Sequence, residues 1–284
     1  MRYNCDLHVH SVFSDGTCTS AELIALARDA GLQAIALCDH NTVSGLPDFV
    51  SAAENSGVKG IPGIEFSTEY LGGELHILGL FLLPEHAEKV NALLQEALQR
   101  KEQSNIDLIR RLNEAGILLD YHSIKDSMPR GSVVNRAVIA AEMVRRGYCE
   151  SVKAAFKKWL DPEQGYYIPA KRLDAFEVIR FIKSIGAAAV LAHPFLNLKE
   201  EPLRMFLPKA IEAGLDGMET EYPLFDGEKR ALARSIADEF GLLRSGGSDY
   251  HGANKPDIRI GQAAASGEML ELLRRRCGIL SEKP

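Results

Sequence analysis

Short apolar runs alternate with amphipathic segments along most of this chain. Apolar runs of a few residues favour strands, whereas apolar residues spaced three and four apart favour helices. The pattern predicts strands at residues 3–9, 33–37, 58–64, 66–71, 74–82, 187–192, 217–220 and 242–245. It predicts helices at residues 20–30, 46–56, 175–184, 202–213, 228–240 and 269–276. This alternation indicates an α/β fold with a mainly parallel sheet covered by helices.

Local signals set several of these boundaries. Thr19 stands at the expected N-cap of the first helix, and Glu22 occupies its third position, so the two predict a capping box. Gly31 is expected to end the same helix. Gly72 and Gly73 separate two extended runs and predict a β-hairpin.

The pattern changes between residues 85 and 170, where helical spacing replaces the alternation. One long amphipathic helix or a broken pair is predicted at residues 85–116, followed by helices at 133–146 and 151–159. We interpret this region as a helical insertion that caps the substrate site. The predicted parts are a first barrel segment at 1–84, the insertion at 85–170 and a second barrel segment at 171–284.

Residues that commonly bind metals follow the predicted strands. His8 and His10 lie two positions apart, so both side chains project from one face while Leu7 and Val9 face a core. Others lie at or just beyond strand ends, namely Asp15, His40, Glu65, His193, Asp249 and His251. A closed barrel gathers its site from the C-terminal ends of several strands. An open sheet uses a glycine-rich loop before a helix, which Ser245-Gly246-Gly247-Ser248 does not provide.

The composition is that of an ordinary globular protein, with 46% hydrophobic and 25% charged residues among 284. A formal net charge of −6 argues against a surface that holds long nucleic acid, so no stable DNA partner is expected. The five cysteines form no Cys-x-x-Cys pair, and the apolar runs are too short to span a membrane. We therefore expect a cytoplasmic protein without a membrane partner, for which a small anionic substrate is allowed.

Several short motifs occur in a fixed order along the chain. They are Asp6-Leu7-His8-Val9-His10, Ser14-Asp15-Gly16, Asp39-His40-Asn41-Thr42, Pro62-Gly63-Ile64-Glu65, His76-Ile77-Leu78-Gly79, Ala192-His193-Pro194 and Gly247-Ser248-Asp249-Tyr250-His251-Gly252. In this order they resemble the polymerase and histidinol phosphatase (PHP) superfamily of metal phosphoesterases. The resemblance covers nearly the whole chain and implies a distorted (β/α)7-type TIM-like barrel with a helical insertion. The insertion is similar to that of stand-alone PHP proteins that remove the 3′-phosphate from nucleoside 3′,5′-bisphosphates, some of which trim short RNA from its 5′ end.

The resemblance also implies a trinuclear metal centre. The first ion would be held by His8, His10, Glu65 and Asp249, the second by Glu65, His76 and His193, and the third by Asp15, His40 and His251. Nitrogen and oxygen ligands without thiolates suit manganese, iron, zinc or magnesium, so two to three divalent ions are expected. Asp15 is histidine in some relatives, which makes the third site harder. Asp39 is a candidate to orient ligands, and a strand-end cap is the equal alternative.

The implied chemistry is hydrolysis of a phosphate ester by water activated between divalent ions. Asp249 is the first candidate to share the proton of that water, with His193 and His251 as alternatives. The stretch from residue 129 to 159 is rich in basic residues, which are Arg130, Arg136, Arg145, Arg146, Lys153, Lys157 and Lys158. An ordinary charged helical face explains most of them. Arg136 and Lys158 resemble the subgroup's arginine and lysine segments and are the candidates for binding substrate phosphates.

The chain departs from the subgroup's pattern at Val138, Phe195 and Tyr222, where relatives carry histidine, glycine and histidine. We expect these changes to spare the metals and reshape the substrate pocket. The predicted function is a metal-dependent phosphatase that acts on nucleoside 3′,5′-bisphosphates, a nucleotide substrate, and on short RNA 5′ ends. The alternatives are a phosphatase for another small phosphate monoester, such as a histidinol-phosphate-like compound, and a non-catalytic metal-binding PHP domain.

Overall fold

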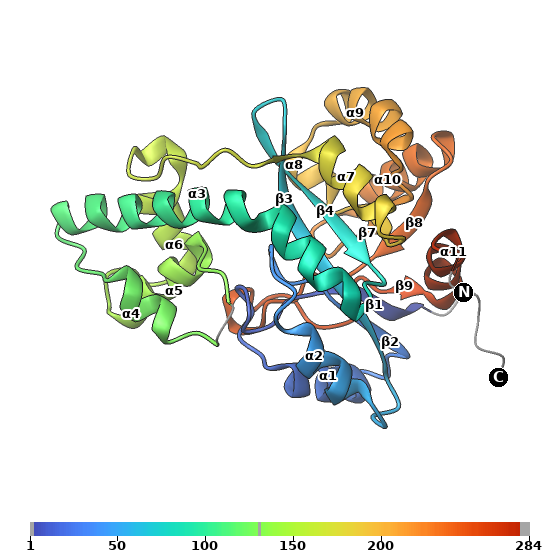
Figure 1. Ribbon diagram of the computed structural model, residues 1–284, viewed down its shortest axis with the longest axis horizontal. Coiled ribbons are helices and arrows are strands. Elements are labelled where there is room, and N and C mark those ends of the chain that lie inside the picture. The colour runs from blue at the N-terminus through green and yellow to red at the C-terminus, as the bar shows by residue number, and fades with distance from the viewer. Residues whose placement is uncertain (1–2, 130–131, 279–284) are drawn as a thin grey trace.

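The computed structural model describes residues 3–129 and 132–278 and has an α/β architecture (Figure 1). Its strands are β1 (Tyr3–Val9), β2 (Ala34–Leu37), β3 (Lys59–Tyr70), β4 (Gly73–Leu80), β5 (Leu173–Asp174), β6 (Ala188–Leu191), β7 (Gly217–Glu221), β8 (Leu243–Gly246) and β9 (Ala265–Ser266). Its helices are α1 (Ser20–Asp29), α2 (Leu46–Ala53), α3 (Ala87–Glu114), α4 (Tyr121–Asp126), α5 (Arg136–Arg145), α6 (Val152–Ala155), α7 (Ala175–Ser184), α8 (Pro194–Asn197), α9 (Glu200–Ala213), α10 (Gly227–Glu239) and α11 (Gly267–Arg276).

The strands form one curved sheet that is nearly closed into a barrel. Its order is β8-β7-β6-β4-β3-β2-β1-β9, and β5 pairs with β3. Neighbouring strands along this order are parallel except at β3/β4, β4/β6 and β1/β9. Beyond β8, the Asp249 amide donates to the His8 carbonyl at 2.8 Å and the His10 amide donates to the Tyr250 carbonyl at 3.0 Å. These bonds join the last barrel strand to the first, and the predicted α/β barrel is confirmed.

The hairpin of β3 and β4 differs from its prediction in one respect. The sequence predicts a strand that stops at Glu65 and a second that starts at Phe66, whereas β3 is one strand over Lys59–Tyr70. It stays continuous because its second half pairs with β4 in an unbroken antiparallel ladder. Glu65 therefore lies inside a strand. The predicted turn is confirmed, with Leu71 at φ 51° and Gly72 at φ 75°.

Most predicted helices are confirmed to within a few residues. The capping box of Thr19 and Glu22 starts α1, and the Glu22 amide donates to Thr19 Oγ1 at 3.3 Å. The elements that the sequence pattern missed are α4, α8, β5 and β9. These elements are short, so they have too few buried side chains to produce a regular spacing of apolar residues in the sequence.

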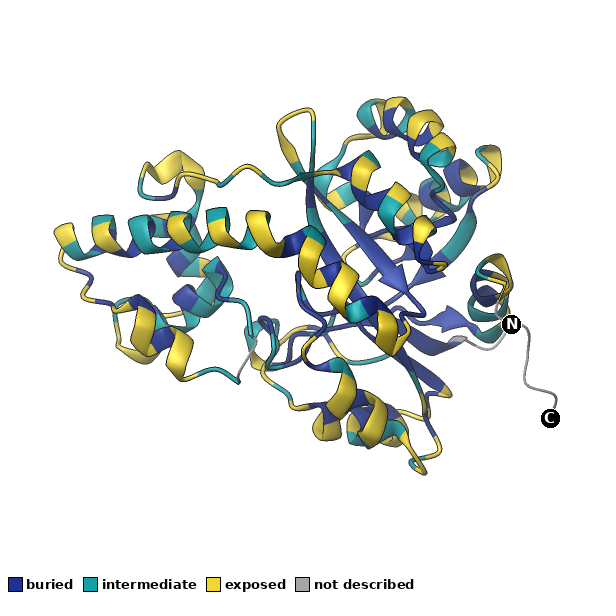
Figure 2. Cartoon of the chain, viewed as in Figure 1, coloured by how far each residue is buried: buried dark blue, intermediate teal, exposed yellow. Residues whose placement is uncertain are grey.

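Figure 2 shows that the strands are largely buried and that the helices around them have both buried and exposed positions. Apolar side chains fill the barrel and the spaces between the sheet and its helices. Leu7, Leu78 and Val190 lie inside the barrel, and α11 closes this core with Met269 and Leu273. Residues of α7, α9 and α10 pack on the outer face of β3, β4, β6 and β7. Residues of α1 and α2 pack on the outer face of β1 and β2. Across the described ranges, every helix is too short or too polar to cross a lipid bilayer.

Helix α3 links the barrel to a second, smaller core. It is a single helix of 28 residues, so of the two predicted alternatives the one long helix is confirmed and the broken pair is wrong. Val90 and Leu94 pack in the core outside the barrel, whereas Leu108 and Leu112 pack with Met143 in the core of the α4, α5 and α6 region. Figure 1 shows α3 running from the barrel to these helices. Because α3 contributes to both cores, the division at residues 84 and 170 stays a prediction.

We expect Gly247→Ala to destabilise the barrel where the chain after β8 meets β1. A Cβ at position 247 would lie 2.4 Å from the His8 Cβ and 2.7 Å from the His8 amide nitrogen, so the two segments would have to separate. Overpacking of this kind costs about 1–3 kcal/mol, which urea unfolding can measure. Gly227→Ala is the matched control, because a Cβ there meets nothing within 4 Å at the start of α10. Equal stability of the two variants would contradict this close approach.

Candidate metal centre

The first strand carries His8 and His10 to the interior of the barrel. Their Nε2 atoms lie 3.1 Å apart, and both side chains are fully buried. The predicted alternation is wrong in one detail, because Leu7 packs inside the barrel whereas Val9 packs outside it against α1 and β2. The β1/β2 ladder is irregular between Asp6 and Val9, as it is at a β-bulge. Such an irregularity re-aims side chains, and here it lets both histidines face the interior.

The Glu65 carboxylate lies at the centre of the site. Its Oε2 atom is 3.2 Å from each of His8 Nε2, His10 Nε2 and His40 Nδ1. Its Oε1 atom is 2.8 Å from His76 Nδ1 and 2.9 Å from His193 Nε2. The carboxylate is fully buried, so its charge is compensated by the groups around it and not by water.

Strand β4 brings His76 to the site from the opposite direction. On the inner face of β4 the polar residues Glu74 and His76 precede the apolar Leu78. On the inner face of β3 the order is reversed, with the apolar Ile61 before Glu65. Because the two strands are antiparallel, the polar residues of both reach the same end of the barrel. His76 therefore lies near the start of β4, next to the C-terminal ends of the parallel strands where the other residues of the site lie.

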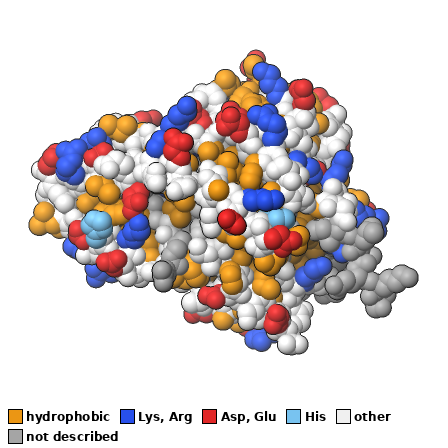
Figure 3. Space-filling view, in the orientation of Figure 1, with side chains coloured by type: hydrophobic (Ala, Val, Ile, Leu, Met, Phe, Trp, Pro, Cys, Tyr) orange, Lys and Arg blue, Asp and Glu red, His pale blue; other side chains and the backbone are white. Residues whose placement is uncertain are grey.

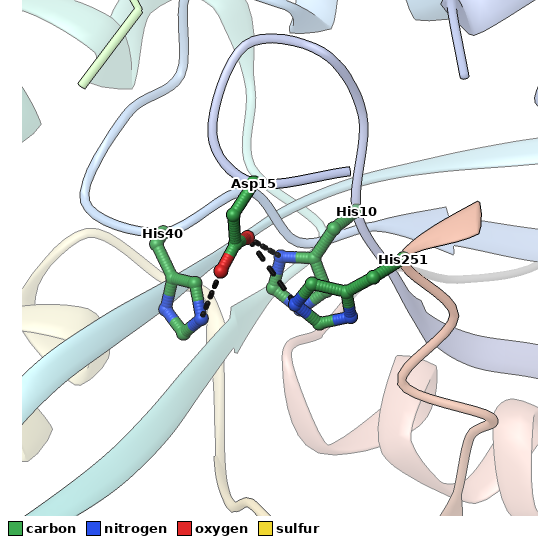
Figure 4. Close-up of side chains that lie close together, drawn as sticks. All are labelled: His10, Asp15, His40 and His251. Carbon is green, nitrogen blue, oxygen red and sulfur yellow. Dashed lines mark ion pairs between the residues drawn. The ribbon is translucent and has the colours of Figure 1, made fainter. Parts of the chain in front are cut away.

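Asp15 gathers a second set of imidazoles beside the first (Figure 4). Its Oδ1 atom lies 3.2 Å from His251 Nε2 and 3.7 Å from His10 Nδ1, and its Oδ2 atom lies 3.8 Å from His40 Nε2. His10 and His40 face Glu65 through their other ring nitrogens. These two imidazoles therefore connect the groups around Asp15 and Glu65.

Asp39 holds the loop between His10 and Asp15. Its Oδ1 atom accepts hydrogen bonds from the Ser11 amide at 2.8 Å and the Ser14 hydroxyl at 2.6 Å. Its Oδ2 atom accepts from the Ser11 hydroxyl at 2.6 Å. Burial raises the pKa of Asp39, although His10 and these donors oppose the rise. Asp39 therefore positions the loop that carries Asp15, and whether it orients metal ligands stays a prediction.

Asp249 presents one oxygen to the histidine pair and is fixed through the other. Its Oδ1 atom lies 3.2 Å from His10 Nε2 and 3.7 Å from His8 Nε2. Its Oδ2 atom accepts hydrogen bonds from the Tyr222 hydroxyl at 2.7 Å and from Lys255 Nζ at 2.6 Å. Burial would raise the pKa of Asp249, but Lys255 and the nearby histidines hold it well below its usual value. A carboxylate with so low a pKa is a weak proton acceptor.

Glu219 is a residue of the site that the motifs did not indicate. Its Oε1 atom lies 3.0 Å from His8 Nδ1, and its Oε2 atom accepts a hydrogen bond from the His193 amide at 2.6 Å. It turns His8 Nε2 toward Glu65, as carboxylate partners do for metal-binding histidines. The alternation of β7, in which Met218 faces the outer core, is the sequence signal that places Glu219 inside.

The donor atoms converge as they do around metal ions. In three groups the ligand atoms all lie within 4.8 Å of one another, and these are His8, His10, Glu65 and Asp249; His10, Asp15, His40 and His251; and His40, Glu65 and His76. Glu65 Oε2 and His40 Nδ1 are buried, and within the described part of the chain neither makes a hydrogen bond. A cation would satisfy both atoms together with the facing imidazole nitrogens. The residues therefore fit divalent metal ions.

The carboxylates of the site require positive charge near them. Burial would lower the pKa of His10, but Asp249 and Glu65 raise it to about 9. Burial would also lower the pKa of His76, but Glu65 and Glu74 raise it to about 10. At His40 burial dominates and lowers the pKa to about 3. Because a metal binds neutral imidazole, divalent cations can replace the protons that His10 and His76 would otherwise carry.

A cavity is lined on one side by residues of this cluster and on the other by residues of α3 and α5. Its lining includes Asp15, His40, Glu74, His76, Lys101, Arg136, Tyr167, Lys171 and Arg172. The Arg136 guanidinium lies 4.3 Å from the centroid of the Tyr167 ring and 3.9 Å from Glu74. Arg172 pairs with Glu74 at 2.8 Å. The structure therefore places Arg136 beside the cluster, together with basic residues that the motifs did not indicate.

Lys158 does not line this cavity. It is exposed, and its Nζ lies 5.2 Å from the centroid of the Trp159 ring. The helix predicted at residues 151–159 is regular only over α6, and Phe156–Leu160 forms a wider π-helical turn. Arg130, another basic residue of the segment, lies outside the described residues.

The three positions that depart from the subgroup's pattern lie in different parts of the structure. Val138 packs in the core of the insertion, and the Phe195 ring lies 5.6 Å from the Phe225 ring. Tyr222 donates to Asp249 and so touches the cluster itself. The expectation that these positions spare the metals and reshape the substrate pocket stays a prediction, and none of the three is among the described residues that line the cavity.

A nearly closed α/β barrel with a buried cluster of histidines and carboxylates at its C-terminal end defines the class of metal-dependent barrel hydrolases. The chain belongs to the PHP domain family, whose model matches residues 6–168.

Known proteins with different names match most of the chain. A 5′-3′ exoribonuclease of Haemophilus influenzae is 33% identical over 87% of this chain and 89% of the relative. A phosphoribosyl 1,2-cyclic phosphate 1,2-diphosphodiesterase of Eggerthella lenta is 30% identical over 87% and 94%, and a 3′,5′-nucleoside bisphosphate phosphatase of Chromobacterium violaceum is 28% identical over 91% and 90%. A crystal structure assigned as a metal-dependent phosphoesterase of Bifidobacterium adolescentis aligns with a TM-score of 0.88 and 27% identity over 97% of both chains. The protein is accordingly a PHP phosphoesterase and a hydrolase.

We expect Glu219→Gln to weaken metal binding about 10–100-fold, because an amide orients the His8 ring less firmly than a carboxylate does. Elemental analysis after dialysis against graded metal concentrations measures the change. Glu221→Gln is the matched control on the same strand, since Glu221 is also buried but its carboxylate pairs with Arg234 at 2.7 Å. Equal metal affinities in the two variants would show that Glu219 does not orient His8.

Proposed function

We propose that this phosphoesterase removes the 3′-phosphate from nucleoside 3′,5′-bisphosphates and also acts on short RNA from its 5′ end. The cavity beside the cluster carries the proposal, because Lys101, Arg136, Lys171 and Arg172 line it against the carboxylates Glu74 and Asp15. This positive excess lies in a chain whose net charge is −6. A substrate with one phosphate at the cluster and another among the basic side chains would use both features.

The distribution of charge elsewhere supports a small substrate. On the face shown in Figure 3, basic and acidic side chains are interspersed and do not form a field of one sign. Binding of long nucleic acid across such a face would gain little from phosphate neutralisation. A nucleotide or the end of a short RNA needs only the cavity.

The proposed cofactor is two to three divalent ions, with manganese, iron, zinc and magnesium all suited to these ligands. The proposed ligands are His8, His10, Glu65 and Asp249 for the first ion, Glu65, His76 and His193 for the second, and Asp15, His40 and His251 for the third. Bound divalent ions would activate water at neutral pH and neutralise the phosphoryl oxygens. The protein's part is to hold these imidazoles in place around the carboxylates of Glu65, Asp15 and Asp249.

Hydrogen bonds at Nδ1 fit His193 and His251 to a ligand role. His193 Nδ1 donates to Asn197 Oδ1 at 3.1 Å, and His251 Nδ1 donates to the Asp249 carbonyl at 2.8 Å. In this tautomer each Nε2 turns a lone pair toward a carboxylate of the site, where a cation would bind. The assignment of Asp249, His193 and His251 to proton transfer stays a prediction, and the hydrogen bonds from Tyr222 and Lys255 make the Asp249 carboxylate a weaker base than an unpaired one.

The relatives support the substrate class without fixing the substrate. The Chromobacterium relative is a bisphosphate phosphatase, and the Haemophilus relative is an exoribonuclease. The Eggerthella relative, which is named for a cyclic phosphate, is as similar as these, so a cyclic phosphodiester is the second candidate. Turnover of a nucleoside bisphosphate, a phosphoribosyl cyclic phosphate and a simple phosphate monoester, each with manganese, decides among them.

We expect chelation to abolish activity of the parent protein. Glu65→Ala should lose more than one ion and all measurable turnover, because Glu65 lies between the proposed sites of two ions. Asp15→Ala should lose one ion and regain part of its activity when metal is added, because it serves only the outer group. Elemental analysis and activity against metal concentration measure both. The same response in the two variants would contradict this division, and a metal-free parent that hydrolyses phosphate esters would contradict the cofactor.

We expect Arg136→Ala to lower kcat/KM for 3′-phosphoadenosine 5′-phosphate about a hundredfold, because it removes binding to a phosphate away from the reacting bond. Hydrolysis of p-nitrophenyl phosphate should fall much less. Arg136→Lys should also be harmful, since lysine lacks the planar fork that stacks on Tyr167. Lys158→Ala is the control on an exposed cation of the same region. Equal losses on both substrates would assign Arg136 to the reacting phosphate or to folding.

A further inference from the structure

The two oxygens of the Asp249 carboxylate have different surroundings. Oδ1 faces imidazole nitrogens, at 3.2 Å from His10 Nε2 and 3.3 Å from His251 Nδ1. Oδ2 faces two side-chain donors from other segments, which are the Tyr222 hydroxyl at 2.7 Å and Lys255 Nζ at 2.6 Å. A carboxylate with both oxygens free can bind a metal ion through one oxygen or through both. The surroundings of Oδ2 therefore decide how Asp249 can act as a ligand.

Both acceptor positions of Oδ2 are occupied. An ionised carboxylate has about four lone-pair sites, two on each oxygen. The Lys255 ammonium can only donate, and the Tyr222 hydroxyl must also donate because an ionised carboxylate has no proton to give. These two hydrogen bonds use the sites of Oδ2 and leave those of Oδ1 for the imidazole side. Glu65 differs from Asp249, because both of its oxygens face imidazole nitrogens.

The fold holds both donors in place. Tyr222 directly follows β7 and is 2% exposed, and its ring centroid lies 5.2 Å from that of Phe225. Lys255 directly follows the 3-10 helix Gly252–Asn254, and its amide donates to the carbonyl of the first residue of that helix at 3.1 Å. Asp249 therefore meets donors from two separate segments, one after β7 and one after β8.

We propose that Tyr222 and Lys255 are positioning residues that restrict Asp249 to binding the first ion through one oxygen. This inference rests on the metal ligands of the proposed function, and it adds two residues that the ligand groups do not contain. With Asp249 limited to Oδ1, an ion held by the histidine pair and Glu65 keeps a coordination position for a ligand from outside the protein, as a catalytic metal site requires. Without the two donors, Oδ2 could turn to the ion and fill that position.

This role has a different consequence from that of Glu219. Glu219 orients a histidine ligand, so its loss should weaken metal binding. Loss of Tyr222 or Lys255 leaves every proposed ligand in place and removes a donor that competes for the charge of Asp249. The carboxylate then attracts a cation more strongly. Metal binding should therefore be kept or strengthened while turnover falls.

The test uses Tyr222→Phe, Lys255→Met and the double variant, which remove the donors and keep most of the side-chain volume. Lys255→Arg keeps a cationic donor. Tyr250→Phe is the matched control, because Tyr250 directly follows Asp249 but its hydroxyl contacts the Cys18 sulfur at 3.7 Å.

Cobalt serves as the probe ion, since the intensity of its visible absorption falls as its coordination number rises. For the parent and each variant, the cobalt affinity, the absorption per bound ion and the thermal unfolding are measured. Steady-state hydrolysis of p-nitrophenyl phosphate gives kcat and KM.

Tyr222→Phe and Lys255→Met should each bind cobalt at least as tightly as the parent, with weaker absorption per bound ion. Each should lower kcat about tenfold or more and change KM little, as expected for a residue that acts through a metal ligand. The double variant should show both changes more strongly, Lys255→Arg should recover part of the parent's values, and Tyr250→Phe should match the parent. Weakened cobalt binding, unchanged absorption per bound ion, or the same changes in Tyr250→Phe would each overturn the proposal.

The proposed function and this inference fail in different ways. A parent that binds no cobalt refutes the proposed metal centre and, with it, the positioning role. A parent that binds cobalt and hydrolyses p-nitrophenyl phosphate but not a nucleoside bisphosphate refutes the proposed substrate only. In that case the expected changes in absorption and kcat still support the role of Tyr222 and Lys255.

Discussion

A carboxylate buried inside a barrel must have positive charge around it, and the arrangement of the site follows from this requirement at Glu65. Isolated burial of such a charge costs several kcal/mol, so the imidazoles from β1, β4 and the loops after β2 and β6 are structural as well as functional. Without cations, protons on His10 and His76 compensate the carboxylates. Metal binding therefore displaces protons, and metal affinity and the folding of this end of the barrel are linked.

Closure of the barrel is what brings the first and last strands into this cluster. The Asp249 amide donates to the His8 carbonyl, so residues of the cluster from opposite ends of the chain are neighbours in one ladder. Two residues at the site have left-handed backbones, Asp249 at φ 53° and His193 at φ 27°. Non-glycine residues adopt this region at a cost, typically about 1–3 kcal/mol. Glu219 offsets part of it at His193 by accepting the hydrogen bond of its amide.

The sequence predicted the elements whose apolar residues recur at a regular spacing, and it predicted few of the features that break this spacing. Strands, helices and the hairpin follow from spacing and glycine, and His8 and His10 follow from strand alternation. The irregularity in β1, which puts Leu7 and Val9 on opposite faces of the sheet, cannot be predicted from this spacing. The same holds for the π-helical turn at Phe156–Leu160, in which Lys158 is exposed. The position of Lys101 on the wall of the cavity could not be predicted either, because a single lysine on an amphipathic helix usually lies on the surface.

Glu74 links the metal-site cluster of the barrel to the basic residues of the cavity through ion pairs. Its carboxylate lies 3.2 Å from His76 Nε2, pairs with Arg172 and lies near Arg136, so it joins an imidazole of the cluster to the cations of the cavity. Burial would raise the pKa of Glu74, but His76, Arg172 and Lys101 hold it low, so the carboxylate stays ionised. A phosphate entering the cavity must compete with this carboxylate for the two arginines. A dianion would bring more charge to that exchange than a monoanion, and a change at the arginines would reach His76 through Glu74, which contacts both.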